Sequence, residues 1–202
     1  MELNKHFTYS LAKGQKSKVV FSRRTSEGDL VELAEVIYNP REVLGKSSTE
    51  TSIDHTYSFT VPQKPDIVLQ LTRRDVENGF KLTYLFDAKY RIGDTDIDGV
   101  DVPPDDAINQ MHRYRDALYY DPKQEGLPIK KEVLGGYILF PGNGKDEDVE
   151  NANFYRSIEK VNIGAFPLRP NNEGERTFAG TVSAFADLGT TYGTNPSRCK
   201  VA

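Results

Sequence analysis

Two neighbouring runs of apolar residues, at residues 65–71 and 84–91, dominate the hydrophobic pattern of the chain. Both runs are rich in residues that favour strands, and the segment between them is polar and contains a glycine. The pattern therefore predicts a long β-hairpin. Because side chains alternate along a strand, we expect Asp87 and Lys89 on one face, and pairing of the two strands can bring Asp66 beside them.

The same kind of pattern predicts the other strands of a sheet. Residues 133–140 form an apolar run that ends at a Pro-Gly turn, which is the expected place for a parallel strand after a crossover helix. The segment at residues 29–38 fits both a helical stripe and a strand. Shorter strands are predicted at residues 18–21, 56–61, 154–158 and 162–168, with loops at residues 41–55 and 143–150.

A helix is predicted to follow the hairpin. The sequence Pro-Pro-Asp-Asp at residues 103–106 favours a helix start, because proline presets the entry and aspartate suits the positive N-terminal end. Ile108 and Met111 begin a stripe with a period near 3.6, so this helix should pack on the sheet. Gln110 and Tyr114 are four residues apart and therefore share one face.

Two carboxylates and one ammonium group at the end of the predicted hairpin form a candidate site for phosphodiester hydrolysis. Magnesium prefers a few carboxylate oxygens together with waters and substrate phosphate, so Asp66, Asp87 and the backbone carbonyl of Ala88 are a suitable set of ligands. A bound metal lowers the pKa of water, and a lysine such as Lys89 can hold that water against the phosphate.

These residues also carry a resemblance to a known family. Pro65-Asp66, followed by Asp87-Ala88-Lys89 after an apolar run, resembles the active-site signature of the PD-(D/E)XK nuclease superfamily. Together with residues 107–118, these segments are similar in sequence to the C-terminal nuclease domain of McrC-like restriction proteins and to an uncharacterised bacterial family. The likeness covers about residues 10–170.

The resemblance implies a fold. It is an α/β, restriction-endonuclease-like core with a mixed central sheet flanked by helices, in the order αβββαβ, and the first helix is reduced or missing in this chain. It favours a strand at residues 29–38. We expect a nuclease-like domain at residues 1–188 and a polar, disordered tail at residues 189–202. Either residues 1–13 supply a reduced first helix or the chain is the C-terminal part of a larger protein.

The resemblance also implies a function, that of a Mg²⁺- or Mn²⁺-dependent DNA endonuclease in restriction or defence. Asp66 and Asp87 would hold the metal, and Lys89 would orient the attacking water. Gln110 and Tyr114 would line the site as further catalytic residues. The implied partners are DNA and a nucleotide-hydrolysing motor subunit. The location expected from the single cysteine and from an N-terminus without a signal-peptide pattern is the cytoplasm.

Composition adjusts this picture only slightly. A net charge of −4 over 202 residues argues against a protein that coats nucleic acids nonspecifically, but it allows a local basic surface. The single cysteine, Cys199, cannot build a disulfide framework or a thiolate metal site. No apolar stretch is long enough to span a bilayer, and no P-loop is present, so a motor must be in another chain or region.

Some residue assignments stay open. Glu32 or Glu35 is an alternative source of a third metal-site acid, and Arg113 or Arg115 could contact phosphate. The aspartate-rich run at residues 93–101 resembles a calcium loop, but it lacks the glutamate that closes such a loop, so a solvated acidic loop is favoured.

Two other functions also stay open. The fold could be a catalytically silent module for nucleic-acid binding or assembly within a larger protein. Alternatively, Asp66 only caps a strand, Lys89 only pairs with Asp87, and the protein binds something else. The clustering of all three groups favours the nuclease, because like charges repel unless a cation offsets them.

Overall fold

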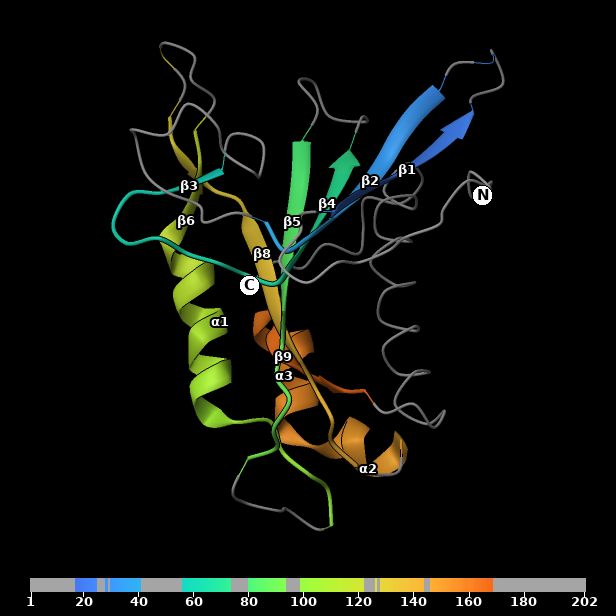
Figure 1. The fold of residues 1–202 in the computed structure, drawn as a ribbon, viewed down its shortest axis with the longest axis vertical. Helices are drawn as coiled ribbons and strands as arrows, with labels where there is room; N and C mark the ends of the chain where they lie inside the picture. The colour runs from blue at the N-terminus through green and yellow to red at the C-terminus, as the bar shows by residue number, and fades with distance from the viewer. Residues whose placement is uncertain are drawn as a thin grey trace.

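A six-stranded sheet forms the centre of the computed structural model, which describes residues 17–24, 28, 30–40, 56–73, 80–93, 99–121, 126, 128–143 and 146–168 (Figure 1). The strand order is β1-β2-β4-β5-β8-β9. These strands are β1 (Ser17–Arg24), β2 (Leu30–Tyr38), β4 (Ile67–Arg73), β5 (Phe80–Ala88), β8 (Val133–Phe140) and β9 (Ile163–Pro167).

The sheet is mixed. The pairs β1–β2, β2–β4 and β4–β5 are antiparallel, whereas the pairs β5–β8 and β8–β9 are parallel. Parallel neighbours need a long crossover connection. Helix α1 (Asp105–Ala117) connects β5 to β8, and helices α2 (Asp146–Asn151) and α3 (Asn153–Val161) connect β8 to β9. The predicted mixed sheet with flanking helices and the predicted hairpin are therefore confirmed.

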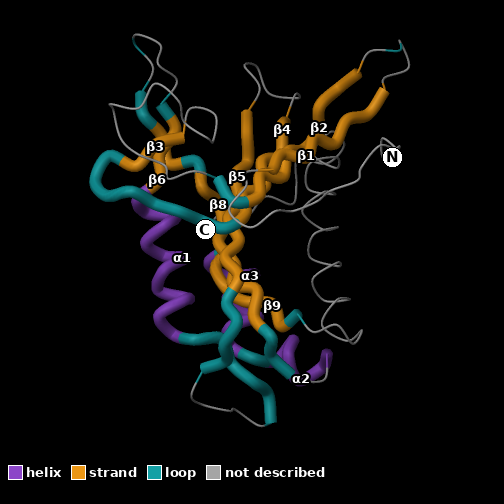
Figure 2. Tube along the Cα trace, in the orientation of Figure 1, coloured by secondary structure: helices purple, strands orange, loops and turns teal. Residues whose placement is uncertain are grey.

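A second, three-stranded sheet lies at the C-terminal end of α1 (Figure 2). It contains β3 (Thr56–Ser58), β6 (Leu118–Tyr120) and β7 (Lys130–Lys131), in the order β3-β6-β7. Because β6 follows α1 directly and pairs with β3, this sheet holds the segment that leads into β4 close to the helix. That segment carries the first of the two predicted acids.

Helix α1 packs on one face of the large sheet. Met111 is fully buried there, and Gly136 on β8 permits the close approach, since a Cβ at Gly136 would lie 3.1 Å from the Cβ of Met111. The buried residues of this layer form one apolar cluster: Ile37, Val68, Leu85, Ala107, Met111, Tyr114, Leu118, Val133, Ile138, Phe140, Ile163 and Ala165. This packing fixes α1 relative to the ends of β4 and β5.

The other face of the sheet forms a second apolar cluster around Tyr137 and Phe166. Tyr155 and Ile158 of α3 pack against this cluster. Gly164 allows α3 to lie close to β9, because a Cβ at Gly164 would come within 2.3 Å of the Phe154 carbonyl oxygen. Helix α3 therefore belongs structurally to the β9 edge of the sheet (Figure 1).

Two predictions about the C-terminal half are wrong. The segment at residues 154–158, predicted to be a strand, lies within α3, and part of the predicted loop at residues 143–150 is α2. A short apolar run fits a helix as well as a strand, and here the apolar residues meet the sheet at helical spacing. Asn162, with a φ of 57°, ends α3 in the left-handed conformation that often closes a helix.

Other expectations have mixed outcomes. Within the segment at residues 29–38, Leu30–Tyr38 is a strand, as the resemblance suggested, and the short strands β6 and β7 were not predicted. Residues 1–13, which could supply a reduced first helix, and the tail at residues 189–202 lie outside the described residues, as do residues 94–98 of the acidic loop. Within the described part of the chain, no helix is both long and apolar enough to cross a membrane.

Candidate active site

Asp66 and Asp87 meet at one end of the β4–β5 hairpin. Ile67 pairs with Phe86 in the antiparallel register, so Asp66, just before β4, lies beside Asp87 near the end of β5. A hydrogen bond fixes this arrangement, because the backbone N–H of Ala88 donates to Oδ2 of Asp66 at 2.8 Å. The register thus brings together the two carboxylates that the sequence singled out.

Lys89 completes the cluster from the residue after β5. Its ammonium group donates to Oδ2 of Asp87, and its backbone N–H donates to the Leu139 carbonyl at 2.8 Å. The Asp87 side chain is 3% exposed, whereas that of Lys89 is 22% exposed. The carboxylate is therefore buried, while the ammonium group lies close enough to the surface to meet a ligand.

The charges at this end of the sheet are not balanced. Burial raises the pKa of the Asp87 carboxyl group, the hydrogen bond from Lys89 opposes that rise, and the negative charge of Asp66 adds to it. Two carboxylates share one ammonium group here. A cation bound between them would remove the repulsion that the Asp66 charge imposes on Asp87.

Gln110 and Tyr114 lie on the flank of α1 that faces these acids. Gln110 Nε2 donates to the Tyr114 hydroxyl at 2.5 Å, and that hydroxyl donates to the Lys64 carbonyl at 2.8 Å. Burial raises the pKa of the Tyr114 hydroxyl, Gln110 opposes the rise, and the charges of Asp87 and then Asp66 increase it. All five predicted site residues are therefore gathered in one region.

The contacts of Tyr114 indicate how it acts. The residue is 6% exposed, and its hydroxyl is both a donor and an acceptor in the bonds just described. It fixes the Lys64 carbonyl, two residues before Asp66, and the Asn39 N–H fixes the Asp66 carbonyl at 2.6 Å. Tyr114 therefore positions the segment that carries Asp66. Sequence reasoning missed the Lys64 carbonyl, because every residue has such a group and no pattern marks it.

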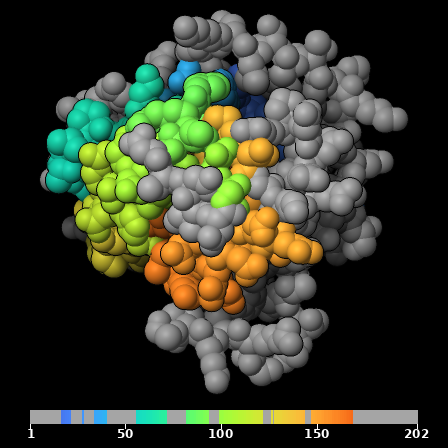
Figure 3. All heavy atoms as spheres, turned by 90° about the horizontal axis from the view of Figure 1, so that it is seen from below, coloured from blue at the N-terminus to red at the C-terminus, as the bar shows by residue number. Residues whose placement is uncertain are grey.

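Arg91 connects the segment after Lys89 to the start of α1. Its guanidinium group donates to both carboxylate oxygens of Asp106, at 2.6 and 2.5 Å. Figure 3, which views the molecule from below, shows the teal segment before β4, the green segment after β5 and yellow-green α1 next to one another. No local sequence pattern indicated this pair, because the two residues are 15 positions apart in the chain.

Among the side chains that the structure describes, no third acid joins Asp66 and Asp87 in a metal-binding group. Glu35 is buried, pairs with Lys18 at 2.7 Å and lies opposite Gln70 on β4. Gln70 is four residues from Asp66, which corresponds to about 13 Å along a strand. The Glu32 side chain lies outside the described residues, and within the described part no group of three or more His, Cys, Asp or Glu side chains could hold a metal.

The donors that are present nevertheless suit a hard divalent cation. Within the described part of the chain, each of the two carboxylates has one oxygen in the hydrogen bonds above, which leaves a second oxygen for a metal. With the backbone carbonyl of Ala88, they match the small protein share of a magnesium shell, which waters and substrate phosphate complete. Asp66 and Asp87 are thus the residues that would hold such an ion.

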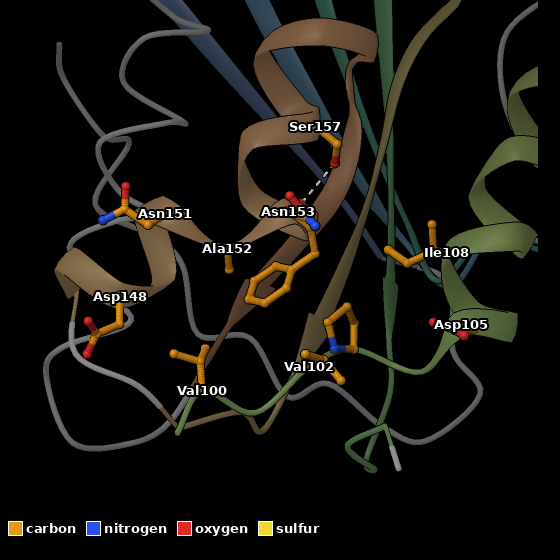
Figure 4. Close-up of a pocket in the computed structure, with 11 residues that line it drawn as sticks. Val100, Val102, Asp105, Ile108, Asp148, Asn151, Ala152, Asn153 and Ser157 are labelled. Carbon is orange, nitrogen blue, oxygen red and sulfur yellow. Dashed lines mark hydrogen bonds between the residues drawn. The ribbon is translucent and has the colours of Figure 1, made fainter. Parts of the chain in front are cut away.

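A cavity of about 470 Å³ lies elsewhere, between the start of α1 and the start of α3 (Figure 4). Its lining includes Ile108, which is on a different flank of α1 from Gln110, and Phe154 of α3. None of the five predicted site residues lines it. Its charged lining residues are Asp105 and Asp148, which would repel a phosphate.

The comparison with known protein families gives a match over most of the chain. A family model described as the PD-(D/E)XK nuclease superfamily matches residues 2–145, which is more than half of the 202 residues and includes all five predicted site residues. No curated protein and no solved structure matches the chain. The likeness to McrC-like proteins therefore stays a prediction.

Proposed function

Because the chain belongs to the PD-(D/E)XK nuclease superfamily, we propose that it is a metal-dependent endonuclease that hydrolyses phosphodiester bonds in DNA. The superfamily that the sequence suggested is confirmed by the family match. The mixed six-stranded sheet with flanking helices agrees with the restriction-endonuclease-like fold. Beyond the superfamily, we propose that the substrate is DNA, that the reaction depends on a metal ion and that each site residue has the role given below.

One observation carries the proposal. The end of a single hairpin brings together Asp66, Asp87 and Lys89, with Asp66 bonded to the Ala88 N–H and Lys89 bonded to Asp87. A buried carboxylate beside a second carboxylate is costly unless a cation or lysine offsets the charge. A lysine alone offsets one charge of two, so a divalent cation is the natural complement of this cluster.

Each residue then has a distinct part in hydrolysis. Asp66, Asp87 and the Ala88 carbonyl would hold Mg²⁺ or Mn²⁺, and the bound ion would lower the pKa of water and neutralise charge on the phosphate. Lys89 leaves Asp87 to donate a hydrogen bond to the attacking water and keep it in line with the phosphorus atom. Gln110 and Tyr114 hold the segment before β4, and with it Asp66, at the required place.

The biological role that we propose is restriction or defence against foreign DNA in the cytoplasm. The resemblance of residues 65–66, 87–89 and 107–118 to McrC-like restriction proteins supports this role. It also supports a nucleotide-hydrolysing motor subunit as the partner that delivers DNA or activates the nuclease. The chain itself has no P-loop sequence, so such a motor would be a separate chain or region.

The test is cleavage of plasmid DNA and of modified plasmid DNA, with Mg²⁺, with Mn²⁺ and with EDTA. The parent protein is compared with Lys89→Ala and with the control Lys160→Ala, which changes an exposed lysine on α3. We expect cleavage with either metal, none with EDTA, a large loss in Lys89→Ala and no change in the control. Cleavage by Lys89→Ala at the parent rate would contradict the proposal.

A result without cleavage separates the proposal from its main alternative. If the parent binds DNA in a salt-sensitive way but shows neither cleavage nor metal dependence, even with a motor partner, the domain is a silent binding module. The Lys89–Asp87 pair and the Asp66–Ala88 hydrogen bond would then be structural only.

A further inference from the structure

Half of the lysine and arginine side chains that the structure describes are bonded to another group of the protein. The bonded side chains are Lys18 with Glu35, Lys89 with Asp87, Arg91 with Asp106, Lys131 with Asp116, and Arg115 with the Val161 carbonyl. Among the cationic side chains that the structure describes, five have neither an ion pair nor a hydrogen bond: Lys64, Arg113, Lys130, Arg156 and Lys160. Their positions decide what they can bind.

Two of these free cations adjoin the candidate active site. Lys64 is exposed and lies two residues before Asp66, and its carbonyl oxygen accepts the hydrogen bond from Tyr114. Arg113 is exposed on α1 next to Tyr114, and its positive charge acts on the Tyr114 hydroxyl together with the charges of Asp87 and Asp66. Both cations therefore lie on the α1 side of the acid cluster.

Arg113 and Arg115 are two residues apart on α1 but have different surroundings. An α-helix turns by about 100° per residue, so the two side chains point in nearly opposite directions. Arg115 donates to the Val161 carbonyl at the end of α3, at 2.5 Å, so its guanidinium group is used in packing α1 against α3. Arg113 lies three residues after Gln110 and therefore beside it on the helix surface, and Gln110 in turn lies four residues before Tyr114.

A nucleic-acid substrate brings a specific electrostatic problem to this site. The acids at the hairpin end repel the phosphates on both sides of the bond to be cut, and the single ammonium group of Lys89 is paired with Asp87. A cation on the rim can bind a neighbouring phosphate and hold the strand against this repulsion. Arginine suits this task because its planar fork binds two phosphate oxygens at once.

We infer that Arg113, with Lys64 beside it, binds backbone phosphates of the nucleic-acid strand on the α1 side of the active site, and that Arg115 does not. The inference rests on the proposed nuclease function and adds the path of the substrate strand. From the acid cluster, the strand would run across the segment before β4 and the middle of α1. The chemistry recognised is the phosphodiester backbone, which DNA and RNA share.

The test measures binding separately from cleavage, in a protein that carries Lys89→Ala. A labelled DNA duplex and an RNA of the same sequence are titrated at several salt concentrations. Arg113→Ala should weaken binding on the order of tenfold at low salt and reduce the slope of log affinity against log salt by roughly 0.9 for each lost contact with duplex DNA. Lys64→Ala should act in the same direction.

Arg156→Ala is the matched control, because Arg156 is also exposed and free of partners but lies on α3. It should leave the affinity and the salt slope unchanged. In the protein with Lys89 intact, Arg113→Ala should raise KM and leave kcat nearly unchanged, which is the signature of a residue that binds substrate without acting on the reacting atoms. Arg113→Lys should recover part of the affinity.

The outcomes separate this inference from the proposed function. If the parent cuts DNA but Arg113→Ala and Arg156→Ala bind alike, the inference is wrong and the nuclease stands. If the protein neither binds nor cuts DNA or RNA, both are wrong. A change in salt slope with only one of the two nucleic acids supports the inference and identifies that nucleic acid as the substrate.

Discussion

Helix α1 has two flanks with opposite character. On one flank, Gln110 and Tyr114 form a chain of hydrogen bonds to the Lys64 carbonyl, beside two acids and a lysine. On the other, Ile108 lines a cavity whose charged lining residues are Asp105 and Asp148, and Arg115 donates to the Val161 carbonyl at the end of α3. The same helix therefore faces two acids and a lysine at the hairpin end on one side and a cavity beside α3 on the other.

The two flanks also differ in what they offer to a phosphodiester substrate. The cavity of about 470 Å³ has no cation in its lining, whereas the acid cluster lies at a strand end where substrate and solvent ions can supply the missing groups. Carboxylates that bind a magnesium ion must be accessible to solvent and substrate, because waters and phosphate oxygens complete the coordination of the ion. We therefore assign function to the acid flank and structure to the cavity flank.

The largest expected effect is on cleavage by Asp87→Asn. The change removes a proposed metal ligand and keeps the side-chain shape, so cleavage should fall by roughly 10³-fold or more, which is several kcal/mol of transition-state stabilisation. The rate is measured in single turnover with Mg²⁺, and circular dichroism should show an unchanged fold. Asp148→Asn, which alters an acid that lines the cavity, should cut at the parent rate. Equal losses in both variants would contradict the proposal that hydrolysis takes place at the acid cluster and not at the cavity.

The next effect is on stability and comes from Gly164→Ala. The new Cβ would meet the Phe154 carbonyl oxygen at 2.3 Å, so α3 must shift away from β9, at a cost of about 1–3 kcal/mol in the free energy of unfolding. Urea denaturation measures this loss. Cleavage per folded molecule should stay at the parent level, and a loss of cleavage beyond the unfolded fraction would show that the α3 region takes part in catalysis.

Tyr114→Phe should have an intermediate effect. It removes the hydrogen bond to the Lys64 carbonyl, which costs about 1 kcal/mol of stability, and it loosens the segment that carries Asp66. We expect cleavage to fall roughly tenfold, since about 1.4 kcal/mol corresponds to a tenfold change in rate. Tyr155→Phe on α3 is the control and should cut normally. If the two variants behave alike, the hydroxyl of Tyr114 has no positioning role.

The smallest effect is expected from Arg91→Ala. The Arg91 and Asp106 side chains are 59% and 68% exposed, so their ion pair contributes at most about 1 kcal/mol after solvent screening. Cleavage should fall less than about threefold, and the loss should shrink as salt is added. Lys131→Ala, which breaks another exposed pair, serves as the control. A large loss specific to Arg91→Ala would give Arg91 a direct role at the site.

The sequence predicted that the two acids and the lysine could lie together, because the positions of side chains along paired strands follow from strand geometry alone. Alternation places Asp87 and Lys89 on one face, and an antiparallel hairpin leaves Asp66 a single region to occupy, which the observed register bears out. The placement of Gln110 and Tyr114 on one flank follows from helical spacing in the same way.

What the sequence could not predict depended on contacts between distant segments. The Tyr114 bond to the Lys64 carbonyl and the Arg91–Asp106 pair leave no local pattern. Helix α3 was mistaken for a strand because a short apolar run fits either period, and only packing against Gly164 and Phe166 decides between them. The sequence also left open whether Arg113 or Arg115 contacts phosphate. The hydrogen bond from Arg115 to the Val161 carbonyl at the end of α3 is what favours Arg113.

The most direct test of the account is Mn²⁺ binding, followed by electron paramagnetic resonance in the presence of a DNA duplex. The parent, Asp66→Asn, Asp87→Asn and Asp148→Asn are compared under the same conditions. We predict a saturable site in the parent and in Asp148→Asn that is lost in the other two variants. Equal binding by all four proteins, or no binding by the parent, would contradict the claim that Asp66 and Asp87 hold the catalytic metal.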